Sequence, residues 1–183
     1  MTSRSGGLGP PIRTTQIHRG VIVNLRASDY RRPDGTVVHR EVMDHPGAVV
    51  MVPVEGDHVL LVRQPREAVE EFTLELPAGK LDSPDEEPLA CARRELAEEV
   101  GRAAATWRDL GGFYTAPAIL TEFIHCFMAT DLTPVHGVAA DEDEAIEVVA
   151  WPLADLASAI DQVRDAKTLI GLMRLERELR AES

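Results

Sequence analysis

The fold class that this sequence predicts is α+β with a mixed β-sheet, and three observations predict it. Segments with strand-like alternation outnumber helical ones, one amphipathic helix interrupts the strands, and two helical segments close the chain. A length of 183 residues with 44% hydrophobic side chains favours one globular domain, with room for an additional arm.

The first 43 residues are expected to form a tail followed by an arm of strands. Residues 1–15 are rich in Ser, Gly and Pro, which predicts a flexible tail. In residues 16–43 apolar positions alternate, and Pro33-Asp34-Gly35 supplies a turn, so we expect a pair of strands there. Residues 44–183 are then expected to form the main domain.

In the main domain, strands are expected at residues 48–54, 58–63, 72–76, 110–114, 123–128 and 146–151. Residues 88–100 are expected to form a helix, because Pro88 suits its first turn and Gly101 suits its C-terminal cap. Two further helices are expected at 152–160 and 166–180. Lys167 is interpreted as a solvated residue at the start of the last helix.

The charge and the apolar pattern exclude several classes of function. A net charge of −12, from 31 acidic and 19 basic residues, argues against a protein that binds a nucleic-acid backbone. No apolar run approaches the ~18 residues that a membrane span needs, and the first ten residues lack a secretory apolar segment. Cys91 and Cys126 are interpreted as buried thiols in a reducing compartment, so a cytoplasmic protein is expected.

Three glutamates share one face of the helix expected at residues 88–100. With 3.6 residues per turn, Glu98 and Glu99 lie on either side of Glu95. Without a cation to neutralise them, each close pair of carboxylates destabilises a helix by about 0.2–0.5 kcal/mol. A hard cation with oxygen ligands reverses that sign. Taken alone, the glutamates favour a solvent-exposed acidic helix face over a metal site.

A longer pattern around this helix resembles the Nudix box. The box reads Gly, five residues, Glu, seven residues, Arg-Glu, an aliphatic residue, any residue, Glu-Glu, any residue, Gly and an aliphatic residue. The matching positions are Gly79, Glu86, Arg94, Glu95, Leu96, Glu98, Glu99 and Gly101. There are two departures: six residues separate Gly79 from Glu86, and Arg102 takes the final aliphatic position.

The resemblance implies a Nudix-type α/β/α sandwich and gives roles to the box residues. It implies that Glu95, Glu98 and Glu99 are ligands of Mg²⁺, which Mn²⁺ can replace, and that Glu98 and Glu99 take part in catalysis. The carbonyl of Ala78 is a further candidate ligand. Gly79, Glu86 and Arg94 are expected to support the box, although the inserted residue leaves the role of Glu86 open.

Segments on both sides of the box resemble the ADP-ribose pyrophosphatase branch of this superfamily; they are residues 40–49, 61–64, 75–79, 113–117 and 140–148. The resemblance makes Arg63, Arg66 and Glu122 candidate substrate contacts, with ordinary surface arginines as the alternative for the first two. In the acidic segment 141–144 it gives Glu142 the position of the general base and Glu144 a metal contact. Glu122 is the alternative base, and a solvated acidic turn is the alternative for the segment.

The function that this resemblance implies is Mg²⁺-dependent hydrolysis of the pyrophosphate bond of ADP-ribose to AMP and ribose 5-phosphate. One alternative is a hydrolase of another nucleoside diphosphate sugar or of a dinucleotide. A second is a catalytically silent domain that senses ADP-ribose, against which the complete set of box glutamates argues. The expected partners are a small nucleotide sugar, no nucleic acid and no membrane. A homodimer is also expected, because in the resembled branch the region equivalent to residues 16–43 exchanges between subunits.

Overall fold

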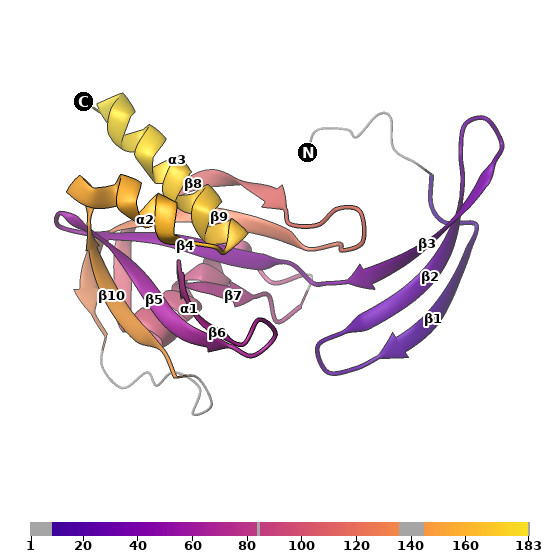
Figure 1. The fold of residues 1–183 in the computed structure, drawn as a ribbon, viewed down its shortest axis with the longest axis horizontal. Helices are drawn as coiled ribbons and strands as arrows, with labels where there is room; N and C mark the ends of the chain where they lie inside the picture. Colours follow the sequence, from indigo (N-terminus) through magenta and orange to yellow (C-terminus); the bar gives the residue numbers. More distant parts are fainter. Residues whose placement is uncertain (1–8, 84, 136–144, 183) are drawn as a thin grey trace. The chain divides into compact units, whose positions relative to one another are not determined.

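The computed structural model describes residues 9–83, 85–135 and 145–182, and it consists of two compact units. The arm unit comprises Met1–His45 and Ala116–Glu122, and the core unit comprises Pro46–Thr115 and Phe123–Ser183. The arm unit holds a three-stranded sheet, and the core unit holds a seven-stranded sheet with three α-helices (Figure 1). The predicted α+β class with a mixed sheet is confirmed.

The arm unit is an antiparallel sheet in the order β1-β2-β3, made of β1 (Arg13–Arg19), β2 (Asn24–Arg31) and β3 (Val37–Asp44). The prediction of two strands is therefore wrong, and the predicted tail is too long because β1 begins at Arg13. The turn between β1 and β2 is closed by the Gly20 N–H, which donates to the Val23 carbonyl at 2.9 Å. Its apolar residues Val21 and Ile22 continue the strand pattern, which hides the turn in the sequence.

The main sheet of the core unit runs β10-β5-β4-β9-β8, while β6 pairs with β5 and β7 with β4. Its strands are β4 (Ala48–Glu55), β5 (His58–Arg66), β6 (Glu71–Glu75), β7 (Ala78–Lys80), β8 (Arg102–Tyr114), β9 (Phe123–Pro134) and β10 (Glu147–Pro152). The pair β4 and β9 is parallel and the other pairs are antiparallel, so the sheet is mixed. The sequence analysis missed β7, which holds the first residues of the box.

Helices cover both faces of this sheet. Along β4, Val49 and Met51 pack in the cluster that contains Leu96 of α1 (Pro88–Val100). Val50 and Val52, which alternate with them, pack in the cluster that contains Leu172 and Leu175 of α3 (Ala166–Glu182). A 3₁₀ turn (Leu153–Asp155) and α2 (Leu156–Gln162) complete the second layer. Because side chains alternate across a strand, this one strand supplies both cores of an α/β/α sandwich.

The helix α1 has the ends that the sequence predicts. The Glu87 side chain caps its start by accepting a hydrogen bond from the Ala90 N–H at 2.8 Å, and Pro88 is its first residue. Gly101 ends it in the left-handed conformation at φ 67°. No described helix is both long enough and apolar enough to cross a membrane.

Candidate active site

The box loop lies against α1 at Gly79. A Cβ atom at this position would lie 1.9 Å from the Glu95 Cδ atom, so only glycine leaves room for the carboxylate of Glu95 beside β7. The next residue towards the N-terminus, Ala78, donates its N–H to Glu99 Oε2 at 3.0 Å. Two of the predicted metal ligands therefore contact the loop: Glu95 lies against Gly79, and Glu99 accepts a hydrogen bond from the Ala78 N–H.

Arg94 is the cation among the box carboxylates. Its Nη1 donates to Glu95 Oε1 at 2.6 Å and to Glu98 Oε2 at 3.0 Å, and its Nη2 lies 3.7 Å from Glu86 Oε1. Burial by itself lowers the pKa of Arg94, but the charge of Glu95 and these hydrogen bonds more than offset it, so the pKa lies above its usual range. Because Nη2 also lies 3.9 Å from Asp82 Oδ2, one guanidinium is paired with four carboxylates.

Glu86 keeps contact with the box in spite of the inserted residue. Its Oε2 accepts a hydrogen bond from the Asp82 N–H at 2.6 Å, while its other oxygen faces Arg94. Glu86 thus contacts both the box loop and the guanidinium of the box helix.

The box glutamates fit a divalent metal ion by the kind of donors they offer. All three supply carboxylate oxygens, which hard cations such as Mg²⁺ prefer. Within the described residues, however, no three His, Cys, Asp or Glu side chains are already gathered as a metal cage. Arg94 and the Ala78 N–H donate hydrogen bonds to these carboxylates instead. A bound cation would therefore replace part of the positive charge and hydrogen bonding that now stabilise the carboxylates.

The other predicted site residues belong to segments outside the box sequence. Glu122 belongs to the arm unit, where its Oε1 is 3.5 Å from His45 Nε2. Glu142 and Glu144 lie outside the described residues. Arg63 is half exposed, with its guanidinium 4.7 Å from the centre of the Phe72 ring and 3.7 Å from Glu147.

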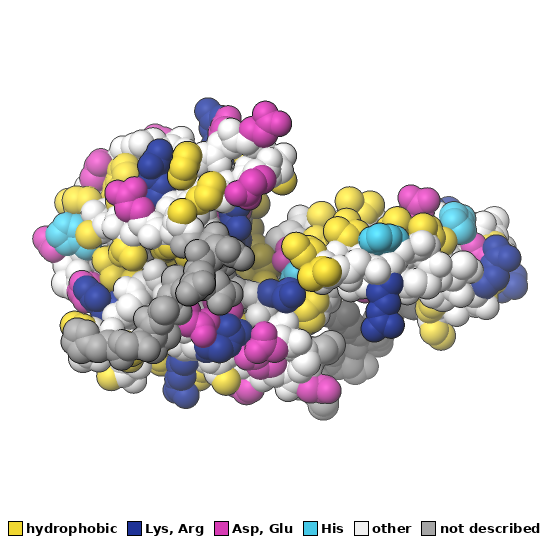
Figure 2. Space-filling model, turned by 90° about the horizontal axis from the view of Figure 1, so that it is seen from below, with side chains coloured by type: hydrophobic (Ala, Val, Ile, Leu, Met, Phe, Trp, Pro, Cys, Tyr) yellow, Lys and Arg dark blue, Asp and Glu magenta, His cyan; other side chains and the backbone are white. Residues whose placement is uncertain are grey.

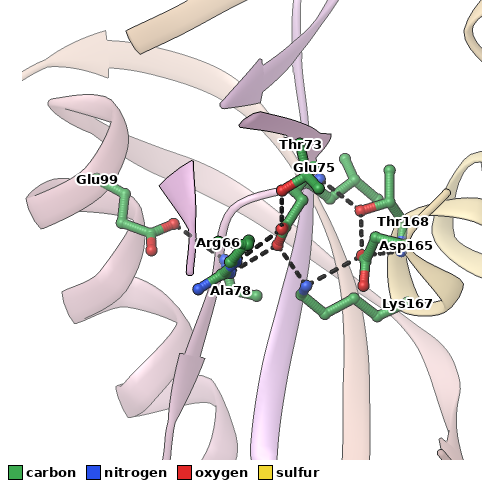
Figure 3. Close-up of polar contacts among 9 residues, drawn as sticks. Arg66, Thr73, Glu75, Ala78, Glu99, Asp165, Lys167 and Thr168 are labelled. Carbon is green, nitrogen blue, oxygen red and sulfur yellow. Dashed lines mark hydrogen bonds and ion pairs between the residues drawn. The ribbon is translucent and has the colours of Figure 1, made fainter. Parts of the chain in front are cut away.

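A second polar cluster, which we call the Glu75 network, lies between β5, β6 and the start of α3 (Figure 3). The Glu75 side chain is only 3% exposed. It accepts hydrogen bonds from Arg66 Nε at 2.8 Å and Nη2 at 2.7 Å, from Lys167 at 2.5 Å and from Thr73 at 2.6 Å. Burial alone would raise the pKa of Glu75, but the hydrogen bonds from Arg66 and the charge of Lys167 more than offset this and lower the pKa to about 2. Glu75 is therefore a fixed anion.

The start of α3 completes this network. Asp165 Oδ2 forms an ion pair with Lys167 Nζ at 3.0 Å and accepts a hydrogen bond from the Thr168 hydroxyl at 2.6 Å. The Thr168 Oγ1 in turn accepts a hydrogen bond from the Leu76 N–H at 2.8 Å. The interpretation of Lys167 as a solvated residue is wrong, because its side chain is 16% exposed and paired with Glu75. Glu75 was not predicted as a site residue, although its place between Leu74 and Leu76 is a signal, because an acid buried among apolar residues needs a partner.

Arg66 connects the two clusters. Its hydrogen bonds to Glu75 are the largest cause of its raised pKa, burial lowers that pKa, and the charge of Glu99 adds to the increase. Figure 3 shows Arg66 and Ala78 between Glu75 and Glu99. Of the two arginines that the sequence singles out, Arg66 therefore lies within the electrostatic field of the box helix.

Comparison with known proteins gives results that agree with this geometry. Residues 43–170 match the NUDIX domain family. The chain is 36% identical over 169 residues to the ADP-ribose pyrophosphatase of Bacillus subtilis, which covers 90% of this chain and 91% of that protein. It is 36% identical over 162 residues to the GDP-mannose pyrophosphatase of Cronobacter sakazakii, which covers 81% of this chain and 84% of that protein. A crystal structure of an ADP compounds hydrolase matches with a TM-score of 0.84 at 26% identity, covering 98% of this chain and 99% of that one.

Proposed function

The chain belongs to the NUDIX family of hydrolases, and on that premise we propose that it hydrolyses the pyrophosphate bond of ADP-ribose to AMP and ribose 5-phosphate. The observation that carries the proposal is the set of Glu95, Glu98 and Glu99 on α1, of which Glu95 lies against Gly79 and Glu99 accepts from the Ala78 N–H of the box loop. Likeness over nine-tenths of the chain to an ADP-ribose pyrophosphatase supports the substrate. Likeness to a GDP-mannose pyrophosphatase makes another nucleoside diphosphate sugar the second candidate.

The cofactor in this proposal is Mg²⁺, held by Glu95, Glu98 and Glu99. When bound, it supplies positive charge that stabilises the diphosphate and its transition state. Arg94 holds Glu95 and Glu98 in place, and the Ala78 N–H holds Glu99. Arg66 offers a guanidinium beside Glu99 that suits a phosphate oxygen.

A carboxylate outside the box accepts the proton of the attacking water in this proposal, because the glutamates of α1 are taken up by the cation and Arg94. We assign this role to Glu142 in the acidic segment 141–144, with Glu144 as an additional metal contact and Glu122 as the alternative base. A general base of this kind typically contributes about 10²–10⁴-fold to the rate.

The proposed assembly is a cytoplasmic homodimer formed through the arm unit. Large apolar side chains are exposed on its strands and turns, namely Ile12, Ile17, Val21, Ile22 and Val37. Figure 2 shows hydrophobic side chains gathered along this part of the molecule. Exposed apolar surface of this kind marks interaction sites. Two buried free thiols, Cys91 and Cys126, agree with a reducing compartment.

A substrate panel tests the proposed activity. The purified chain is incubated with Mg²⁺ and ADP-ribose, GDP-mannose or a dinucleotide, and the products are separated by chromatography. We expect AMP and ribose 5-phosphate to form fastest from ADP-ribose. Intact ADP-ribose beside hydrolysed GDP-mannose would establish the second candidate. Tight binding of ADP-ribose with no hydrolysis of any compound would instead establish a sensor.

Light scattering tests the proposed dimer by measuring the mass of the protein in solution. We expect twice the mass of the chain, and the mass of a monomer would contradict the dimer.

A further inference from the structure

A cavity of about 560 Å³ opens beside the Glu75 network, entirely within the core unit. Its walls are the end of β5, the turn before β6, β6 itself and the start of α3. Its volume falls in the range of small-molecule sites, about 300–1,000 Å³. Of its lining residues, only Arg66 has a role in the activity proposed above.

The floor of the cavity is polar and held rigidly. Glu75 and Lys167 are largely buried, and the hydrogen bonds that fix them also fix Arg66 and Thr73. Side chains locked in this way are pre-organised, so a ligand that binds them loses little free energy in ordering the site. The rim is accessible, since Arg164 and Glu71 are exposed and lie 3.6 Å apart.

The charges that line the cavity balance. Its three cationic side chains and three carboxylates, together with one hydroxyl, are Arg66, Arg164, Lys167, Glu71, Glu75, Asp165 and Thr73. A wall without net charge is a poor site for a polyanion, which needs an excess of cations. Alternating donors and acceptors suit hydroxyl groups, each of which both donates and accepts. Ala68, Val69 and Ala166 add apolar surface for the C–H groups of such a ligand.

Arg66 lies between the cavity and the box helix (Figure 3). That side chain lines the cavity and lies close enough to Glu99 of the box for their charges to interact. In addition, Glu75 and Ala78, three residues apart, join the cavity floor to the N–H that binds Glu99. A ligand with its phosphate at Arg66 would therefore have its hydroxyl groups in the cavity.

We propose that this cavity binds the sugar half of the nucleotide sugar, with Thr73, Lys167 and the rim pair Arg164 and Glu71 facing its hydroxyl groups and Arg66 facing its phosphate. The inference rests on the proposed function and adds to it the place and the chemistry of sugar recognition. It makes the loop before β6 and the start of α3 the elements that select the sugar.

The two products provide separate probes, because AMP carries only the nucleotide half and ribose 5-phosphate only the sugar half. Val69→Trp fills the cavity from its rim, where the Val69 side chain is 59% exposed. We expect the inhibition constant of ribose 5-phosphate against ADP-ribose hydrolysis to rise by about tenfold or more, and that of AMP to stay within about twofold. Met173→Trp is the matched control, since Met173 is similarly exposed on α3 outside the cavity, and it should change neither constant.

A second pair of variants tests the cavity without introducing a bulky side chain. Lys167→Met should weaken inhibition by ribose 5-phosphate selectively, and Lys167→Arg should restore it, because the guanidinium keeps charge and donors. Equal weakening of both products, selective weakening of AMP, or no change in folded Val69→Trp protein would each overturn the inference. If the wild type does not hydrolyse ADP-ribose, the proposed function fails by itself. Calorimetric binding of ribose 5-phosphate to wild type and Val69→Trp then tests the cavity independently.

Discussion

The two polar clusters of the core unit are built on different balances of charge. In the box, the single guanidinium of Arg94 faces four carboxylates, those of Asp82, Glu86, Glu95 and Glu98. In the Glu75 network, two cations, Arg66 and Lys167, are matched by two carboxylates, the buried Glu75 and Asp165. The first cluster is short of positive charge, so an added cation stabilises it. The second is complete without one, so it serves to hold side chains and backbone in place.

Glu98→Gln gives the largest effect that this contrast predicts. Mutating a residue that only holds a metal ligand in place typically lowers metal affinity or activity by about 10–100-fold. Loss of the ligand itself should have a larger effect, so we expect kcat to fall by about 10²–10³-fold at saturating Mg²⁺. Stability should stay equal or rise slightly, because one like-charge repulsion disappears. Steady-state kinetics and thermal melting measure both quantities, with Glu176→Gln on α3 as control. A rate near that of the wild type would remove Glu98 from the ligands.

Glu75→Ala should have the opposite signature, with a large loss of stability. Removing this carboxylate leaves Arg66 and Lys167 without their shared partner, and breaking a buried ion pair typically costs about 3–5 kcal/mol. Urea unfolding measures the loss. Glu178→Ala, which removes a partner of Arg108 nearer the surface, should cost at most about 1 kcal/mol. Equal effects of the two substitutions would contradict the structural role of the Glu75 network.

The low pKa of Glu75 predicts how stability depends on pH. The folded-state pKa of about 2 lies below the ordinary value of 4.5, so the ionised form stabilises the fold above pH 4.5. This contribution, on the order of 3 kcal/mol, is lost progressively as the pH falls from 4.5 towards 2. The difference in unfolding free energy between wild type and Glu75→Gln should therefore narrow over this range. A difference that stays constant from pH 6 to pH 3 would contradict the assignment.

Gly79→Ala should have the smallest effect of the four. The new Cβ would meet the end of the Glu95 side chain, which is flexible and can move aside. We expect the fold to be kept and kcat to fall by about tenfold, because Glu95 then leaves its place beside the loop. Gly9→Ala is the control, because a Cβ atom at Gly9 meets nothing within 4 Å. Gly56→Ala is unsuitable, because the φ of 60° at Gly56 would strain an alanine. Unchanged kcat would show that the close approach is not needed.

The parts that were predictable from the sequence are those with local signals. The helix α1 matches its predicted ends because Pro88 and Gly101 mark them within the segment itself. The box residues follow from a spacing pattern of the same kind. The turn between β1 and β2 was missed because its apolar residues Val21 and Ile22 resemble strand residues, so the two strands were predicted as one.

The Glu75 network shows why the rest could not be predicted. Lys167 and Glu75 are 92 residues apart, and only the packing of α3 beside β6 brings them together. A helix start with Asp165 and Lys167 has the same local pattern whether it is solvated or buried. Tertiary contacts decide between the two, and in this chain they bury Lys167.

The response to metal alone tests the central contrast most directly. Thermal melting is followed with and without Mg²⁺ in wild type, Glu98→Gln and a pair-weakening variant of the other cluster, Lys167→Met. Binding to the folded state raises the melting temperature, so we expect a rise in wild type, an equal rise in Lys167→Met and none in Glu98→Gln. A rise of the same size in Glu98→Gln would place the cation elsewhere and contradict the assignment of α1 as the metal site.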